Sequence, residues 1–410
     1  MSQLATRVPL RRNRDFQLLW IGSTLAGLGS MIGNLAMPLL VLHETGSPAA
    51  AGLVGSVSAL AVLVVSLPAG AVADAVERRR LMICSQLGGV VVAAVLAAAV
   101  LTGRAGLPLI LVATVAVAVF GSLYHPAAMC LVQTTVATGQ LGPAMSRLQA
   151  RTAALQVAGP LCGGVVFSLS HSLPFTVRAA ALIASIACLL AIRARSTPTP
   201  TDRHPMSLGH LTAGVRFVWG QRYLRAILLL FGAGVGTAFS AVLLIALTAA
   251  TDADPSGRSS GAMMALTAVG SLLGSLLAPR LPAFHRPERI LPLTCWICAA
   301  VVPLLALVAA SPLAIGALLG MVLFVAAVGN VAFETEMIRR TPPDLVGRSE
   351  AGQVFISTLA APVGPLGGGL LAERFGSATA FAVVGIMLAL LAATLTTALR
   401  PTPRPAPPTS

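Results

Sequence analysis

A six-residue motif occurs twice in this chain, half a chain length apart. Residues 159–164 read Gly-Pro-Leu-Cys-Gly-Gly and residues 364–369 read Gly-Pro-Leu-Gly-Gly-Gly, 205 residues apart in a chain of 410. A second pair has almost the same offset, because Gly-Ala-Val at 70–72 corresponds to Gly-Ser-Leu at 274–276, and arginines follow each copy. The chain is therefore predicted to consist of two related halves. In a duplicated membrane protein, a functional site is expected where the halves meet, near the bilayer midplane.

The composition makes the membrane the solvent of this chain. Hydrophobic residues make up 56% of it, charged residues only 10%, and the mean hydropathy is +0.88, which leaves too little polar surface for a soluble globule. A transmembrane helix needs about 20 mostly apolar residues. We count twelve such spans, six per half, and therefore predict an all-α membrane protein. The spans begin near Phe16, Ala49, Leu81, Leu107, Ala144, Leu173, Tyr223, Ser260, Ile290, Pro312, Gly347 and Phe375.

The positive charge is distributed unevenly about these spans. The net charge is +14 and all 27 basic residues are arginines, which in a soluble protein would suggest a nucleic-acid partner. With the N-terminus inside, 23 arginines fall in cytoplasmic segments, including Arg147 and Arg151 before the fifth span. The other four are Arg104, Arg178, Arg258 and Arg374. This asymmetry follows the positive-inside rule, so we predict that both termini are cytoplasmic and that no nucleic acid binds.

The sequence divides into five regions. We expect a cytoplasmic basic arm at 1–15, a six-helix bundle at 16–194, a cytoplasmic linker with an amphipathic helix at 195–222, a second six-helix bundle at 223–399, and a disordered cytoplasmic tail at 400–410. The six cysteines fall in apolar spans, no nucleotide-binding loop occurs, and no cluster of catalytic groups is visible. We expect no metal, no cofactor and no enzymatic activity.

The segment after the second span combines a glycine, an acid and a basic cluster. A glycine permits close helix approach, and the acid can meet both the arginines and the positive N-terminus of a facing helix. These residues, called the gating motif below, are Gly70, Asp74, Arg78, Arg79 and Arg80. The segment resembles the signature loop of the major facilitator superfamily. The resemblance implies twelve transmembrane helices in two pseudo-symmetric six-helix bundles, with Asp74 locking a cytoplasmic gate against the eleventh helix, near Arg348. Ala278 stands at the equivalent place in the second half, so the lock should be one-sided.

The repeated glycine-proline motif is similar to the fifth-helix motif of antiporters in that superfamily. Its residues are Gly159, Pro160, Gly163 and Gly164, with Gly364, Pro365 and Gly368 in the second copy. The glycines and prolines either allow close helix packing or mark kinks that serve a transport cycle. Segments 14–20, 124–128, 214–218 and 342–348 also resemble the third drug:proton antiporter group, which includes macrolide and enterobactin exporters.

Ionisable residues within spans are costly and therefore candidates for function. The third antiporter group usually has an aspartate on helix one where this chain has Ser30, so the resemblance implies that coupling uses another group. We predict that Glu334 or His125 exchanges the proton, although a histidine bonded to a carbonyl is the simpler interpretation of His125. Glu336 is expected to pair with the nearby Arg339 and Arg340.

Arg178 lies in the outer part of the sixth span, where it could meet an anionic group or extend to the membrane surface. We favour the surface.

The predicted function is secondary active export of a small amphiphilic compound across the bacterial cytoplasmic membrane, by proton antiport with alternating access. Cavity walls made mainly of small apolar residues suit such solutes. The partners are then the solute, protons and the lipid bilayer, and we expect a monomer. Uptake or lipid flipping by the same fold remains open, as does a non-transporting membrane sensor. The sequence does not identify the substrate-binding residues.

Overall fold

The computed structural model describes residues 10, 12–192, 216, 218–281, 287–341 and 346–399. Almost all of the predicted basic arm before residue 12, most of the predicted linker with its amphipathic helix, and the tail from residue 400 lie outside the described residues.

The first half contains six long helices. They are α1 (Arg14–Thr45), α2 (Pro48–Ala75), α3 (Arg78–Leu101), α4 (Leu107–Thr135), α5 (Leu141–Leu169) and α6 (Leu173–Ala191), with a short 3₁₀ turn η1 (Thr138–Gln140) before α5. Local signals set where several of them begin. The Asn13 side chain accepts a hydrogen bond from the backbone N–H of Phe16, and Ser47 does the same for Ala50, which caps the starts of α1 and α2.

The second half is helical too, with local departures from α geometry. It contains α8 (Arg222–Ala226), the π-helix η3 (Ile227–Val235), α9 (Gly236–Ala253), α10 (Arg258–Leu277), the 3₁₀ turn η4 (Ala278–Arg280), α11 (Pro287–Val301), the 3₁₀-helix η6 (Val302–Val308), α12 (Pro312–Arg340), α13 (Val346–Ala360) and α14 (Val363–Ala398). The first three form one continuous stretch, and so do α11 and η6.

The described residues contain eleven stretches long and apolar enough to cross a membrane, the last of which runs over 47 residues from Gly352 to Ala398. Gly376 interrupts that stretch with φ 78° and ψ 160°, a conformation that favours glycine. It divides α14 into two segments, so the twelve predicted spans are confirmed.

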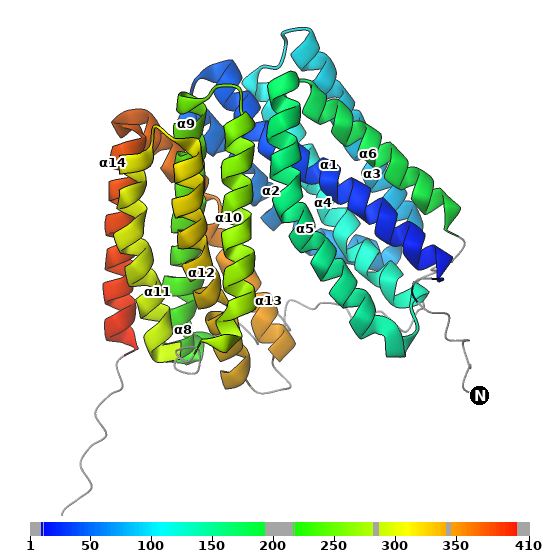
Figure 1. The fold of residues 1–410 in the computed structure, drawn as a ribbon. Helices are drawn as coiled ribbons and strands as arrows, with labels where there is room; N and C mark the ends of the chain where they lie inside the picture. The colour runs from blue at the N-terminus through cyan, green and yellow to red at the C-terminus, as the bar shows by residue number, and fades with distance from the viewer. Residues whose placement is uncertain are drawn as a thin grey trace, which may run out of the picture.

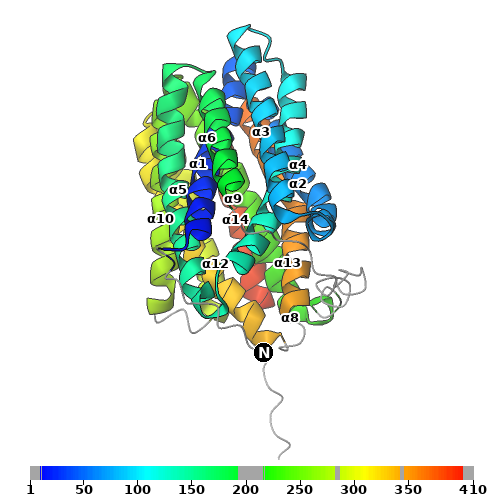
Figure 2. The ribbon, with the colours of Figure 1, turned by 90° about the vertical axis from the view of Figure 1, so that its right-hand side faces the viewer.

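The spans form two bundles, α1–α6 and α8–α14, drawn from two sides in Figures 1 and 2. The first bundle is tilted relative to the second (Figure 1). We call the end where α1 begins and α14 ends the termini side, and the opposite end the far side. The two bundles lie closest together at the far side and diverge toward the termini side (Figure 1).

The repeated glycine motif forms the contacts between the halves at the far side. A Cβ atom on Gly164 of α5 would lie 2.7 Å from the Cα atom of Gly261 in α10. The equivalent Gly369 of α14 lies equally close to the start of α2, where a Cβ would overlap the carbonyl oxygen of Pro48. Two helix pairs, α5 with α10 and α14 with α2, therefore join the halves in the same way. We call these contacts the far-side seams.

Other glycines of the motif pack each helix within its own half. A Cβ on Gly159 would overlap Met31 of α1, and one on Gly368 would lie 2.9 Å from the Cα of Ala241 in α9. Moreover, α5 continues as an α-helix through Gly159 and Pro160. These observations support the packing interpretation of the first copy; whether the motif also bends during transport stays a prediction.

In the second copy the helix breaks before the motif, at Ala361 and Pro362, between α13 and α14. The Ser56 hydroxyl of α2 occupies the break, donating to the Pro362 carbonyl and accepting from the backbone N–H of Leu366 at 3.0 Å. The predicted kink at Gly364 and Pro365 is therefore displaced toward the start of the helix. A side chain inserted into the helical hydrogen-bond ladder is a recognised cause of such a break.

Glu373 reinforces the same seam. Its carboxylate accepts from the backbone N–H of Ala49 at 2.9 Å and from the Ser47 hydroxyl at 2.5 Å. An acid from the second half thus caps the N-terminus of α2, where negative charge is stabilised by the helix dipole.

Candidate functional site

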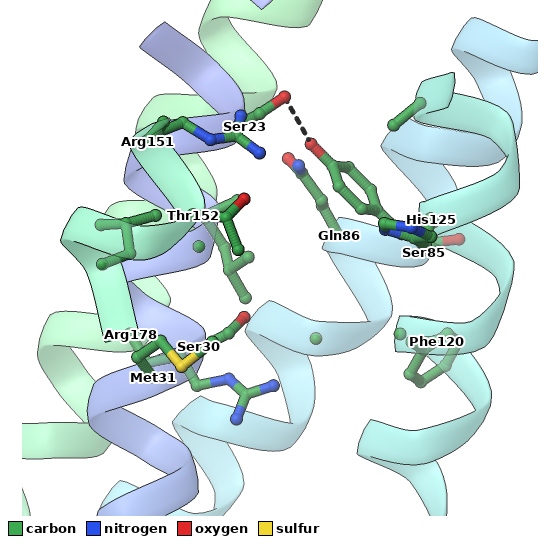
Figure 3. A pocket seen from close by; sticks show the side chains of 18 of the residues that line it. Ser23, Ser30, Met31, Ser85, Gln86, Phe120, His125, Arg151, Thr152 and Arg178 are labelled. Atoms are coloured by element: carbon green, nitrogen blue, oxygen red, sulfur yellow. Dashed lines mark hydrogen bonds between the residues drawn. The ribbon is translucent and has the colours of Figure 1, made fainter. Parts of the chain in front are cut away.

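A cavity of about 370 Å³ lies inside the first half, between α1, α3, α4, α5 and α6 (Figure 3). Most of its wall is apolar, with Met31, Phe120, Leu155 and Leu182 among the large side chains, as the composition predicted. Its polar part was not predicted as a group. The polar side chains are Ser23, Ser30, Ser85, Gln86, Tyr124, His125, Arg151, Thr152 and Arg178.

Two of these polar groups are oriented by hydrogen bonds between helices. The Tyr124 hydroxyl of α4 donates to the Ser23 hydroxyl of α1 at 3.2 Å. The Gln86 amide of α3 donates to the Ser185 hydroxyl of α6 at 2.9 Å, while its carbonyl oxygen Oε1 is buried with no hydrogen-bond partner. The cavity therefore presents oriented polar groups from α1, α3 and α4.

Arg178 is held within the bundle by the glycines of α1. Its side chain is 8% exposed, and a Cβ atom on Gly33 would lie 2.7 Å from its Nη1 atom. Gly29 brings the backbones together in the same region, since a Cβ there would lie 3.2 Å from the Arg178 Cα. The prediction that Arg178 reaches the membrane surface is wrong, because two glycines one turn apart leave it space between α1 and α6.

Arg151 lies well inside α5. It is ten residues past the start of α5 at Leu141, which places it roughly 15 Å along the helix at 1.5 Å per residue. Whether Arg151 lies on the cytoplasmic side of the bilayer, as we assigned it, stays a prediction. Its Nε and Nη1 atoms, like the Nε atom of Arg178, are buried without a hydrogen-bond partner.

A second cavity, of about 310 Å³, lies between the two halves. Helices α1, α2, α4 and α6 contribute from the first half, and α9, α10 and α14 from the second. Arg178 lines this cavity as well as the first, together with Asn34, Ser58 and Ser240. The guanidinium thus lies in a wall shared by a cavity inside one bundle and a cavity between the bundles.

Residues 4–406 match the family model of transmembrane secretion effectors. The chain belongs to this family. It is also similar to solved major facilitator transporters: the nucleoside transporter NupG has a TM-score of 0.76 at 12% identity, covering 94% of this chain and 99% of that one. A bacterial homologue of the iron transporter ferroportin, in an inward-facing state, gives 0.71 at 15% identity and covers 96% and 100%. The predicted major facilitator fold is confirmed.

Curated relatives of this chain are multidrug efflux pumps. The pump Tap of Mycolicibacterium fortuitum is 30% identical over 272 residues, which cover 63% of this chain and 65% of the relative. Tap of Mycobacterium tuberculosis is 27% identical over 220 residues, covering 51% and 52%. The matched stretches thus span about two thirds and about half of those relatives. The chain is a multi-pass membrane protein with the major facilitator fold.

The two predicted proton-coupling residues lie in different surroundings. His125 lines the first cavity, beside Tyr124 on α4. Glu334 is exposed on α12, accepts a hydrogen bond from the Asn330 amide at 3.0 Å, and lines neither described cavity. Ser30, which stands where the antiporter group has an aspartate, also lines the first cavity. The two candidates therefore do not form one site.

Glu336 is an ion-pairing residue, as predicted. Its side chain is 2% exposed and forms ion pairs with Arg339 at 2.6 Å and Arg340 at 2.5 Å. Arg340 also pairs with Glu288 at 3.4 Å and lies over the Tyr223 ring, 3.7 Å from its centroid. This network ties α12 to α8 and α11 at the termini side.

The gating motif is only partly described. Gly70 and Asp74 belong to the last turns of α2. The surroundings of Gly70 and the side chains of Asp74 and Arg348 lie outside the described part of the chain. Arg79 contacts the end of α6, donating to the carbonyls of Leu189 at 2.8 Å and Leu190 at 2.7 Å. It therefore satisfies the end of a helix in its own half, and the gate role of Asp74 stays a prediction.

Among the described residues, no group of three or more His, Cys, Asp or Glu side chains could hold a metal ion.

Proposed function

We propose that the transporter exports a small amphiphilic compound from the bacterial cytoplasm, driven by proton entry and working as a monomer by alternating access. The observation that carries this proposal is the first cavity, a space of about 370 Å³ with mostly apolar walls and a few oriented polar groups. Such mixed lining suits a solute with both an apolar body and a polar group. The efflux pumps among the relatives support the outward direction.

Alternating access in this fold would use the two far-side seams as one of its gates. The seams close the far side through α5 with α10 and α14 with α2, whereas the ribbons diverge at the termini side. We propose that this is the arrangement open to the cytoplasm, and that the gating motif closes the termini side in the opposite arrangement. The two bundles would then rock about the second cavity, near the midplane.

A transport assay tests the function directly. The purified protein is reconstituted in liposomes, a pH gradient is imposed, and uptake of a panel of lipophilic dyes and antibiotics is followed in both gradient directions. We expect accumulation on the acidic side that an uncoupling ionophore abolishes. Accumulation on the opposite side would support uptake instead, transbilayer movement of a labelled phospholipid would support flipping, and no movement of any compound would support a sensor.

The proposed location in the cytoplasmic membrane, with both termini inside, has its own test. A reporter enzyme that is active only outside the cytoplasm is fused after Thr201 or after Ser410. We expect no activity from either fusion, and strong activity from a fusion within the far-side loop at Ser256, which lies between α9 and α10. Activity at Thr201 or Ser410 would contradict the orientation.

A further inference from the structure

The first cavity contains two arginines but no acid. Its lining residues include Arg151 and Arg178 and neither aspartate nor glutamate. Among the described residues, no carboxylate forms an ion pair with either guanidinium; the ion pairs of this part of the chain involve Glu77, Glu288 and Glu336. A buried charge is normally paired, because removing it from water is costly. Two cations that face one cavity without counter-charge therefore point to an anionic ligand.

The guanidinium atoms without partners are the ones that an anion would use. Arg151 leaves Nε and Nη1 unpaired, and each can donate a charge-assisted hydrogen bond to an oxyanion. Arg178 leaves Nε unpaired and is itself 92% buried, given its exposed fraction of 8%. Figure 3 shows both side chains extending into the cavity, with Thr152 between them on the α5 side and Gln86 opposite.

The rest of the cavity determines what kind of anion fits. The volume of about 370 Å³ is far larger than an inorganic ion requires, and Met31, Phe120, Leu155 and Leu182 supply apolar wall. An apolar body with one anionic group satisfies both parts of the lining. A cation would instead meet like charge in a space with low dielectric.

We infer that the first cavity binds an amphiphilic solute whose oxyanion group, a carboxylate, sulfonate or phosphate, accepts hydrogen bonds from the guanidinium group of Arg151 or of Arg178. That the bound solute is also the transported compound rests on the proposed function. The binding itself does not depend on transport. Arg178 also lines the second cavity, so the same guanidinium can contact the anion from the space between the halves.

Matched probes test the charge preference on the unmodified protein. Dansylglycine carries a carboxylate, dansylglycinamide is its neutral analogue of the same size, and dansylethylenediamine is cationic. Binding of each to the full-length protein in nanodiscs is measured by fluorescence titration. We expect dansylglycine to bind at least about tenfold more tightly than the amide, the ratio that one charge-assisted hydrogen bond gives, and the cation to bind most weakly. Equal affinities for the three probes would overturn the inference.

Substitutions then locate the preference. Arg151→Gln and Arg178→Gln should each reduce the dansylglycine preference toward unity while leaving the affinity for the amide unchanged, and Arg178→Lys should keep part of it. Arg104→Gln is the matched control, because Arg104 is exposed in the loop between α3 and α4, away from both cavities. A preference that persists in both glutamine variants would contradict the inference. If these variants do not fold, the wild-type probe comparison still decides.

Two further measurements separate the sources of the anion and the two proposals. Chloride or inorganic phosphate is added at millimolar concentration to displace dansylglycine. If either ion binds with the same affinity as dansylglycine, the site holds a small counter-ion, and the assignment to a solute is overturned. Gradient-driven export of a cationic dye without an anion preference would support the proposed function and contradict this inference. Anion-selective binding without any transport would do the reverse.

Discussion

The backbone N–H of Leu366 donates its hydrogen bond to the Ser56 hydroxyl, across the boundary between the two halves. In an uninterrupted helix that N–H would bond to the carbonyl of Pro362, four residues earlier. The Ser56 hydroxyl donates to that carbonyl instead, so one side chain replaces a helical hydrogen bond. A side chain of the first half therefore bridges the break between α13 and α14.

We expect Ser56→Ala to weaken the far-side seam. Without the hydroxyl, Leu366 and Pro362 can bond directly only if the helix straightens, and the loss of one such interaction is worth about 1 kcal/mol, roughly a fivefold shift between two conformers. Spin-label distances across the far side would show a larger open population. Ser168→Ala is the control, because its hydroxyl bonds within α5. Unchanged distances in Ser56→Ala would mean that the break does not depend on the hydroxyl.

The glycines of the second motif should differ sharply in their tolerance of a methyl group. A Cβ on Gly369 would overlap Pro48, whereas nothing lies within 4 Å of a Cβ on Gly367. We expect Gly369→Ala, and equally Gly164→Ala, to lower the melting temperature of the detergent-solubilised protein. The added methyl group causes steric overlap, which typically costs about 1 to 3 kcal/mol of stability. Gly367→Ala should be neutral or slightly stabilising, since alanine favours helix. Similar melting temperatures for all three would contradict the close seams.

Coupling should depend more on His125 than on Glu334. His125 lines the first cavity, where water and solute can reach it, whereas Glu334 lines neither cavity. We expect His125→Asn to remove most of the gradient-driven transport while retaining solute binding, Glu334→Gln to have a smaller effect, and the double variant to be uncoupled. The control is His43→Asn, a histidine outside both cavities whose ring contacts that of His171, with centroids 3.9 Å apart. Full coupling in the double variant would exclude both residues.

Asp74→Asn should impair transport while leaving the protein inserted. The change keeps the side-chain volume but removes the charge expected to brace the termini-side gate, and a charge-assisted contact is worth about 1.5 to 3 kcal/mol. Initial rates in liposomes, at matched protein content, should fall at least about tenfold. Glu77→Gln provides the comparison, because Glu77 pairs with the exposed Arg80 at 2.8 Å and such surface pairs contribute little. Equal rates in both variants would leave the motif a packing role alone.

The fold could be read from the sequence because its signals repeat and are long. Twelve apolar runs and a glycine motif with a fixed offset predict two six-helix bundles without any tertiary information. Glu336 was also predictable, since its partners Arg339 and Arg340 are three and four residues away on the same helix.

The polar lining of the cavity could not be predicted in the same way, because it depends on contacts between helices. Arg178 lies near the start of an apolar span, where a long side chain usually extends to the membrane surface. Its actual position depends on Gly29 and Gly33, more than 140 residues earlier in the chain, which leave space against α1. The two glycines and the arginine are visible in the sequence. Their contact could not be predicted, because it depends on how α1 packs on α6.

Every residue that lines the first cavity belongs to α1–α6. A solute held there keeps the same protein contacts whichever way the second bundle is tilted. A ligand with equal affinity for two conformers does not change their ratio, however tightly it binds. The cargo would then stay bound to the first bundle while the second bundle changes its tilt. The free energy that drives this change of tilt must therefore come from a group other than the cargo, such as the proton.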